Sequence, residues 1–361
     1  MKKRRLCEIC NPKQWKTISS DMLKSEGYPV YGANGVIGYF SEYNHEKATL
    51  LITCRGATCG MLNICEPFSY VNGNAMALDN LSPEIDLHYL YYYLMTRGLS
   101  DAITGSAQPQ IVRQSLQKVE ISYPSLDEQR RIAAVLDKVS DMIAKRREQL
   151  DKLDELVKAR FVEMFGNCNY PRQPLISLIK EGTGLSYGIV QPGDDGTGDL
   201  GVIRPVDMVD GNISIDSIKH IDRAIGDSFK KTELTGDELL ITVRGTTGIT
   251  ALTDVRFKGM NVTRGIAVIR YNRSKINPAY LNAYLNTAES QNYIQEHTRG
   301  ATLQQINLSD LRIQEILLPP MYLQEHFSDY ATLINKSKLT IQQSLDKMET
   351  LKKALMQEYF G

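Results

Sequence analysis

Residues 125–166 read SLDEQRRIAAVLDKVSDMIAKRREQLDKLDELVKARFVEMFG, and they predict one long helix. Ser125 and Glu128 have the spacing of a capping box, in which both side chains accept hydrogen bonds from backbone N–H groups at a helix start. Apolar residues then recur in alternating steps of three and four, interrupted only at Arg146 and Arg160, as in a coiled coil. The seam expected on this helix consists of Ile132, Leu136, Val139, Ile143, Leu150, Leu153 and Val157.

A second helix with the same pattern is expected in residues 319–361, 195 positions further on. The prolines of Leu318-Pro-Pro320 precede it, and Gly166 and Gly361 close the two helices, as helix boundaries require. Its expected seam consists of Ile334, Ile341, Leu345, Met348 and Leu355. Two halves related by a pseudo-twofold axis would bring these helices together antiparallel. The alternative is that each helix packs separately on its own domain.

The segments before each helix also repeat. LLITCRG (50–56) returns as LLITVRG (239–245), and GSAQPQI (105–111) is echoed by GATLQQI (300–306). An apolar β-rich run closed by Arg-Gly is typical of a buried strand that ends in a turn. The sequence therefore predicts an α+β fold in four segments: two mixed domains with substantial β-structure, 1–124 and 167–318, and two long helices, 125–166 and 319–361, that form an antiparallel coiled coil with pseudo-twofold symmetry.

Composition excludes several classes of protein. The 361 residues hold 42 Lys and Arg against 42 Asp and Glu, so any nucleic-acid binding must depend on local patches or on charge supplied by partner proteins. No stretch approaches the roughly 20 apolar residues that span a bilayer, and we expect a cytoplasmic protein. The six cysteines are expected to be reduced thiols in a chain of this size. Cys7 and Cys10 have half of a zinc-ligand spacing and no second pair, so no metal site is predicted.

The sequence lacks the catalytic motifs expected of an ATPase or a methyltransferase. The chain has no Walker-type GxxxxGK[ST] sequence and no methyltransferase cofactor loop or Asn/Asp-Pro-Pro-aromatic motif. Asp154, Glu155 and Lys158 belong to the polar face of the first helix, where mixed charges usually form a solvated surface. We therefore predict no catalytic residues.

Two similar domains joined by long helices suit a ligand with two separated, inversely related features. Duplex DNA offers such features at about 3.4 Å per base pair. A helix of this length measures roughly 60 Å. The DNA between the outermost points that the two domains can reach is therefore limited to roughly 17 base pairs. The sequence thus predicts binding to double-stranded DNA at a bipartite site.

The chain resembles the specificity subunits of type I restriction-modification systems over essentially its whole length. The resemblance rests on PSLDEQRRIAAVLDK (124–138), YPVYGANGVIGYF (28–40), the paired LLIT-x-RG motifs and GATLQQI (300–306). It implies two target-recognition domains, each reading one half-site, and helices that dock two methyltransferase subunits, with restriction subunits joining through these. It also implies that S-adenosylmethionine, ATP and Mg are used by the partners and that this chain binds no cofactor. A stand-alone bipartite DNA-binding regulator or a non-catalytic scaffold is the alternative.

Residues shared by both halves are candidates for contacts that do not depend on DNA sequence. Arg55 and Arg244 stand at equivalent positions in Gly-rich turns, where backbone amides can approach a phosphate. The alternative is that each arginine caps a strand or pairs with an acid. The threonines predicted to accompany them are Thr58, Thr246 and Thr247.

The glutamines of the second motif can form paired hydrogen bonds with adenine, or they can stabilise the loop that holds them. These residues, with two neighbours, are Gln108, Gln110, Arg299, Thr302, Gln304 and Gln305. Stretches that differ between the halves should read different bases. The candidates there are Tyr31, Asn34, Tyr187, Gln191 and Arg204, although the glycines and prolines around them are also ordinary turn formers.

Overall fold

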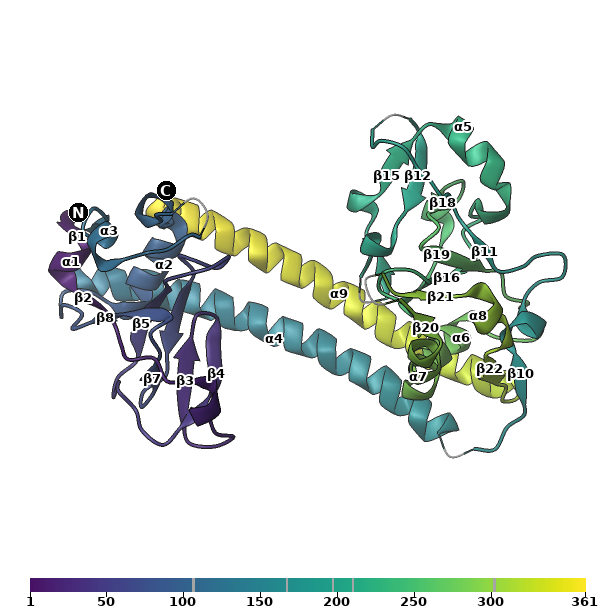
Figure 1. Ribbon diagram of the computed structural model, residues 1–361, viewed down its shortest axis with the longest axis horizontal. Coiled ribbons are helices and arrows are strands. Elements are labelled where there is room, and N and C mark those ends of the chain that lie inside the picture. The colour runs from purple at the N-terminus through teal and green to yellow at the C-terminus, as the bar shows by residue number, and fades with distance from the viewer. Residues whose placement is uncertain (106–107, 167, 197, 210, 301–302) are drawn as a thin grey trace. The chain divides into compact units, whose positions relative to one another are not determined.

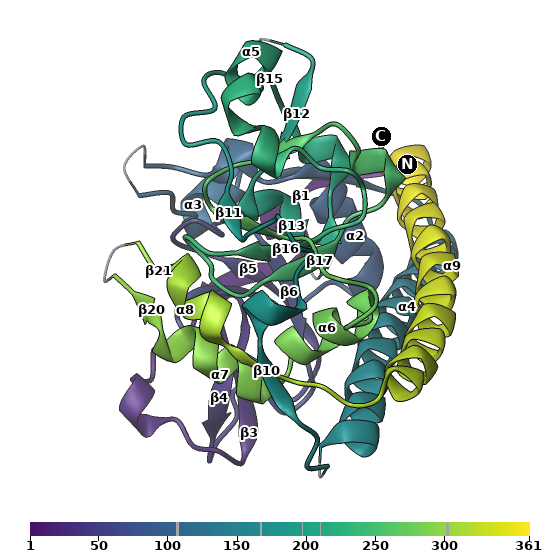
Figure 2. The same ribbon diagram turned by 90° about the vertical axis from the view of Figure 1, so that its right-hand side faces the viewer.

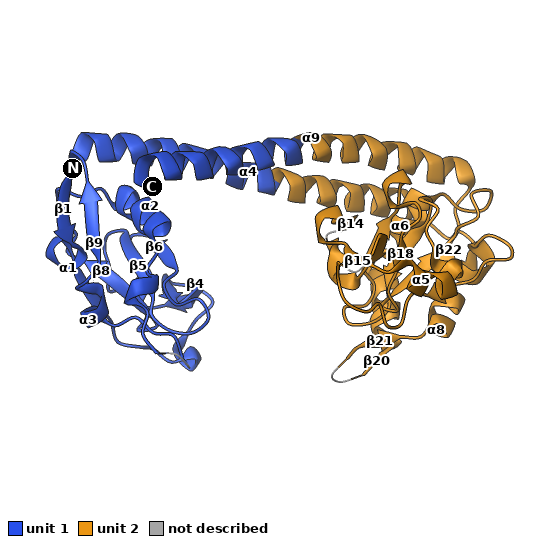
Figure 3. Cartoon of the chain, turned by 90° about the horizontal axis from the view of Figure 1, so that it is seen from above, with its two compact units in different colours: residues 1–148, 341–361 blue, residues 149–340 orange. Residues whose placement is uncertain are grey.

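The computed structural model describes residues 1–361 except 106–107, 167, 197, 210 and 301–302 (Figure 1). It divides into two compact units, residues 1–148 with 341–361 (unit 1) and residues 149–340 (unit 2) (Figure 3). The long helices α4 (Leu126–Phe165) and α9 (Met321–Phe360) each contribute one half to each unit. The mixture of long helices and short strands confirms the predicted α+β class. No helix in the described part of the chain is long and apolar enough to cross a membrane.

Unit 1 is built on a four-stranded antiparallel sheet in the order β2-β8-β5-β6, with LLIT at its centre as β5. Its strands are β2 (Asn11–Gln14), β8 (Ala75–Asp79), β5 (Thr49–Thr53) and β6 (Leu62–Cys65). A three-stranded sheet β4-β3-β7 and a pair β1-β9 complete the unit, with β1 (Lys2–Arg5), β3 (Tyr28–Gly32), β4 (Gly35–Phe40), β7 (Tyr70–Val71) and β9 (Glu120–Tyr123). The shorter helices are α1 (Leu6–Ile9), η1 (Ser20–Met22), α2 (Leu87–Arg97), η2 (Ser100–Ala102) and α3 (Arg113–Leu116).

Unit 2 repeats this plan with the second LLIT at the centre of its main sheet. That sheet has the order β11-β19-β16-β17, with β11 (Ser186–Tyr187), β19 (Ile266–Ile269), β16 (Leu239–Thr242) and β17 (Thr250–Leu252). The second sheet is β15-β12-β18, with β12 (Leu200–Ile203), β15 (Lys219–Ile221) and β18 (Asn261–Val262). Pairing of β12 with β18 is parallel, as is pairing of β3 with β7 in unit 1. The sequence repeat is therefore a repeat of topology.

The remaining strands of unit 2 form three pairs, whose members are β10 (Arg172–Pro174) with β22 (Glu315–Leu317), β13 (Met208–Val209) with β14 (Asn212–Ile213), and β20 (Thr298–Arg299) with β21 (Gln305–Ile306). Its α-helices are α5 (Arg223–Gly226), α6 (Pro278–Leu285), α7 (Ala288–Glu296) and α8 (Leu308–Ile313). Its 3-10 helices are η3 (Leu175–Leu178), η4 (Pro205–Asp207), η5 (Ile215–Ser217), η6 (Asp227–Thr232) and η7 (Val255–Phe257).

The long helices run antiparallel within each unit. In unit 1, Arg147 of α4 pairs with Glu349 of α9 at 2.6 Å, and in unit 2, Asp154 pairs with Lys338 at 2.5 Å. In unit 2, Phe161 of α4 also packs against Phe327 of α9, with ring centroids 5.3 Å apart, so the residue number rises on α4 as it falls on α9. In unit 1, Leu355 and Tyr359 of α9 pack against the core that contains Ile132 of α4, which together with the Arg147–Glu349 pair gives the same direction. These contacts confirm the antiparallel arrangement within each unit. Both ion pairs are partly exposed to solvent, so each adds little to stability.

The seam positions divide between two kinds of packing. Ile132 and Leu136, in the first turns of α4, are buried in the core of unit 1. Val139, Ile143 and Leu345 are buried further along the helix pair, outside the domain cores. Half-buried positions make up the rest of the predicted seam, namely Leu150, Leu153, Val157, Ile334, Ile341, Met348 and Leu355. Each long helix thus serves a domain core at its ends and its partner helix between them.

A buried glutamine ties the first turn of each long helix to a neighbouring helix. In unit 1 the Oε1 atom of Gln129 accepts a hydrogen bond from Asp86 N at 2.9 Å. Its Nε2 atom donates to the carbonyl oxygens of Glu84 and Pro124, at 2.9 and 3.1 Å. Asp86 is the N-cap of α2, so one amide side chain holds the starts of α2 and α4 together.

Unit 2 has the equivalent contact 195 residues later. Gln324 accepts from Asn277 N at 2.9 Å and donates to Pro319 O at 2.8 Å. Asn277 is the N-cap of α6. Both glutamines are at most 1% exposed, so their hydrogen bonds are shielded from water.

Candidate nucleic-acid interface

The Arg-Gly turn and the glutamine loop, more than 50 residues apart in sequence, meet in unit 1. Gly56 N donates to Pro109 O at 3.2 Å, and Ile111 N donates to Cys54 O at 2.9 Å. Arg55 therefore forms an isolated β-bridge with Gln110. Gly56 has a φ of 86°, a conformation that favours glycine and lets the chain turn immediately after the arginine.

Unit 2 makes the same junction with the same hydrogen bonds. Gly245 N donates to Gln304 O at 2.9 Å, and Ile306 N donates to Val243 O at 3.0 Å. Arg244 forms an isolated bridge with Gln305, and Gly245 has a φ of 85°. The two motifs that repeat in the sequence are thus one structural feature, present once in each unit.

Two further loops join this feature in both units. In unit 1, the Thr53 hydroxyl donates to Ala33 O, and Cys54 N donates to Asn74 O at 3.1 Å. In unit 2, Val243 N donates to Gly265 O at 2.8 Å, and a Cβ atom on Gly265 would lie 2.6 Å from Pro205 Cγ. We call these four loops the loop edge: residues 33–34, 55–56, 73–74 and 108–110 in unit 1, and residues 205–206, 244–245, 264–265 and 303–305 in unit 2. Within unit 2, the β20–β21 hairpin of this edge lies on the side away from the long helices (Figures 2 and 3).

The arginines of the loop edge have no acidic partner in the described part of the chain. Arg55 is exposed and Arg244 is half-exposed, and neither forms an ion pair or a side-chain hydrogen bond with a described residue. The same holds for Arg264, which is exposed in the loop between β18 and β19. Sequence reasoning missed Arg264 because its loop matches residues 72–74 of the other half only in backbone structure. Unpaired guanidinium groups in Gly-rich turns can bind phosphates or base edges.

The other residues predicted in unit 1 lie in two environments. Gln108, Gln110 and Asn34 are exposed on the loop edge. Tyr31 is 7% exposed, and its hydroxyl accepts from Glu66 N at 3.3 Å, so the side chain points into the unit. Burial raises the pKa of Tyr31, and the phenol keeps its proton. Thr58 is half-buried in the turn that follows Arg55.

In unit 2, Tyr187, Gln191, Thr246 and Gln304 are exposed, and Gln305 is half-buried. Buried Thr247 shares a hydrogen bond with the Thr298 hydroxyl at 3.1 Å. Thr302 lies outside the described residues. Assignment of any of these side chains to DNA stays a prediction.

Two predicted arginines of unit 2 have acidic partners. The Arg204 guanidinium donates to the buried carboxylate of Asp207 at 2.8 and 3.0 Å and to Ser217 O at 2.6 Å. This pair fixes the turn beside the loop edge and occupies two of the guanidinium nitrogens. Arg299 lies 3.7 Å from Asp310 and is 71% exposed at its side chain, so it stays accessible.

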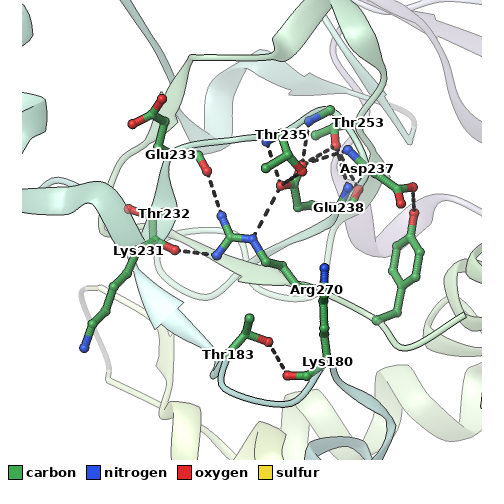
Figure 4. Close-up of polar contacts among 12 residues, drawn as sticks. Lys180, Thr183, Lys231, Thr232, Glu233, Thr235, Asp237, Glu238, Thr253 and Arg270 are labelled. Atoms are coloured by element: carbon green, nitrogen blue, oxygen red, sulfur yellow. Dashed lines mark hydrogen bonds and ion pairs between the residues drawn. The ribbon is translucent and has the colours of Figure 1, made fainter.

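Strand β16 leads into the turn that carries Arg244, and it is anchored at its start by Glu238, which is fully buried (Figure 4). Its carboxylate accepts five hydrogen bonds of 2.7–3.0 Å, from Thr235 N and Oγ1, Gly236 N, Asp237 N and Thr253 Oγ1. Arg270 approaches it at 3.5 Å and donates to the carbonyl oxygens of Lys231 and Glu233. Burial by itself raises the pKa of Glu238, but the hydrogen bonds outweigh it and hold this pKa below its usual range.

Unit 2 is therefore expected to lose stability in acid. Because the pKa of Glu238 is lower in the folded state, its contribution is complete above the unfolded pKa of about 4.3 and is lost as pH falls through the folded pKa. Urea unfolding followed by hydrogen exchange at β16, at about pH 6 and about pH 3.5, measures this loss. Glu238→Gln should unfold at lower urea at pH 6 and depend less on pH. Glu233→Gln, which changes an exposed carboxylate nearby, should behave as the parent; equal pH dependence in all three proteins would contradict the expectation.

Among the residues that the structure describes, no group of three or more His, Cys, Asp or Glu is placed to hold a metal ion. Burial raises the pKa of Cys10 to about 12 and also raises the pKa of Cys7.

Comparison with known proteins gives a consistent result. The family model described as "Type I restriction modification DNA specificity domain" matches residues 1–155 and 197–357. The specificity subunit of the type I restriction enzyme EcoprrI from Escherichia coli is 32% identical over 142 residues, 38% of this chain and 35% of that relative. The EcoBI specificity subunit from the same species is 21% identical over an alignment of 374 residues that covers 93% of this chain and 74% of the relative.

Two solved structures share the fold. The type I restriction-modification S subunit from M. genitalium has a TM-score of 0.66 at 15% identity, covering all of this chain and 96% of that one. A chain from a study of complex assembly and conformational transition of the type I R-M system has a TM-score of 0.52 at 15% identity, covering 99% of this chain and 97% of that one. At this level of identity the likeness concerns the fold alone.

Proposed function

The chain belongs to the family of type I restriction modification DNA specificity domains, and we propose that it is the DNA-recognition subunit of a type I restriction-modification complex. The observation that carries this proposal is the loop edge, built once in each unit with the same hydrogen bonds. Two copies of one interface suit a bipartite site, in which each unit binds one half-site in duplex DNA.

The loop edge offers both kinds of contact that a sequence-specific protein needs. Arg55 and Arg244 occupy equivalent positions, so they can bind the phosphates that every half-site presents. The glutamines beside them can form paired hydrogen bonds with adenine. Because the net charge of the chain is zero, these local cations would provide the electrostatic attraction that the chain itself contributes.

The helices have a separate role in the proposal. Each has 40 residues, which corresponds to roughly 60 Å, and a pair of this length can set the spacing between half-sites. Exposed apolar side chains along them suit contact with partner proteins. These are Leu156, Val162, Leu333, Leu339 and Leu351. We propose that two methyltransferase subunits dock there and that restriction subunits join through them. The partners would use S-adenosylmethionine, ATP and Mg, and this chain would perform no chemistry.

Methylation mapping tests the proposal directly. Genomic DNA is sequenced for modified bases from cells that retain the methyltransferase subunit, with and without this chain. We expect methylation at one split motif to disappear without the chain and to return when it is expressed again. A complex with an active methyltransferase and an unchanged pattern of methylation would contradict the proposal; DNA binding without any effect on methylation would then favour a regulator, and no DNA binding a scaffold.

A further inference from the structure

The loop before β19 has the same backbone as the loop before β8, although their sequences differ. Ile266 N donates to Thr263 O at 3.0 Å, as Ala75 N donates to Asn72 O at 2.9 Å. Thr263 N donates a hydrogen bond to Ile203 O of the adjacent parallel strand at 2.9 Å. In unit 1, Asn72 N donates to Tyr31 O at the same distance. Together with the bonds from Val243 N and Cys54 N, these contacts make Thr263-Arg264-Gly265 the equivalent of Asn72-Gly73-Asn74.

The equivalent loops present different side chains at the same place. Unit 1 carries Gly73 and then exposed Asn74, and unit 2 carries exposed Arg264 and then Gly265. By contrast, the adjacent turn carries an arginine in both units (Arg55 and Arg244). The adjacent loop carries a glutamine in both units (Gln110 and Gln305). A residue common to both units cannot distinguish two half-sites, whereas this loop can.

Arg264 is held on a rigid support. Its backbone N donates to Ile189 O at 2.8 Å, and the next residue packs so closely against Pro205 that a Cβ atom would lie 2.6 Å from Pro205 Cγ. Its side chain is exposed and has no acidic partner among the described residues. The apolar side chains of Val190 and Val206, 47% and 72% exposed, lie in the adjoining segments. The backbone of Arg264 is therefore held in place while its guanidinium group is exposed. Such a group can enter a DNA groove without first breaking an ion pair.

We propose that Arg264 determines part of the sequence specificity of unit 2 by reading a guanine, at a place where unit 1 carries Gly73 instead. Arginine matches the O6 and N7 acceptors of guanine with two parallel hydrogen bonds. This proposal rests on the proposed function, because it concerns which bases the loop edge reads.

The test compares methylation motifs for the complete complex containing the parent chain, Arg264→Ala, Arg264→Lys or the charge control Arg256→Ala. Arg256 lies in the 3-10 helix η7, which follows β17 at the opposite end of the β16–β17 hairpin from Arg244. For the parent chain we expect a G·C pair at a fixed position of one half-site. Arg264→Ala should accept other bases there, with discrimination reduced roughly 10- to 100-fold, while the other half-site stays unchanged. Arg264→Lys should also lose discrimination, because lysine lacks the planar fork of donors.

Three outcomes separate the possible failures. An unchanged motif in Arg264→Ala would overturn the assignment of Arg264. A uniformly weaker methylation of the same motif would overturn it in favour of a phosphate contact. If the parent chain itself directs no methylation to any split motif, the proposed function fails before the variants are considered.

Discussion

Replacing Arg55 and Arg244 together by alanine is expected to weaken binding of the complex to its split DNA site by about 100-fold, with each single change costing about tenfold. Both arginines are unpaired within the described chain, and each sits in a turn whose glycine has a positive φ. A hydrogen bond between a guanidinium and a phosphate is charge-assisted and stronger than a neutral one. The two losses should add because the residues lie in separate units.

Binding is measured by fluorescence anisotropy at several salt concentrations. If both arginines contact phosphates, the double variant should reduce the slope of log affinity against log salt by about two, and the preferred bases should not change. The control is Arg256→Ala, whose guanidinium is already paired with Asp254 at 2.6 Å. An affinity within about twofold of the parent would contradict the phosphate contact; an altered base preference would place the arginines on bases instead.

Gln129→Leu is expected to destabilise unit 1 by about 3 kcal/mol, because leucine leaves one N–H and two carbonyl groups without their buried amide partner. The groups left unpaired are Asp86 N, Glu84 O and Pro124 O. Gln324→Leu should cost unit 2 less, about 2 kcal/mol, since only two groups lose a hydrogen bond there.

Urea unfolding with hydrogen exchange resolved along the chain measures both effects. Exchange should accelerate in α2 for Gln129→Leu and in α6 for Gln324→Leu. Gln343→Leu, an exposed position of α9 in unit 1, provides the matched control and should leave exchange in α2 unchanged. Equal stability of Gln129→Leu and the parent would show that water or neighbouring groups replace these hydrogen bonds.

The fold was predictable because its signals are local and repeated. Alternating steps of three and four place apolar residues on one helical face, so Val139 and Ile143 indicated a long helix without any knowledge of its partner. The return of LLIT-x-RG indicated a second copy of the unit, because the same apolar run closed by the same turn requires the same surroundings. The α+β class and the antiparallel helices followed from these two observations.

The site was predictable only in part. The repeat directed attention to Arg55 and Arg244, but nothing in the sequence placed them beside the glutamine loops. Arg204, chosen for its position in a variable stretch, is held by Asp207 three residues later. Tyr31 is turned inward to Glu66 N. Whether such a side chain is exposed or engaged inside the unit depends on neighbouring residues that the local sequence pattern does not specify.

The sequence by itself thus determined the number of units, their class and their helices, because periodicity and repetition are properties of the chain alone. Only the tertiary structure decided which loops form one edge and which arginines there are free of acids. It also revealed Arg264, whose equivalence to Gly73 lies in backbone hydrogen bonds between strands remote in sequence. Such pairings between strands are determined by the packing of the whole unit. The sequence pattern of either strand alone therefore does not indicate which side chain the loop presents.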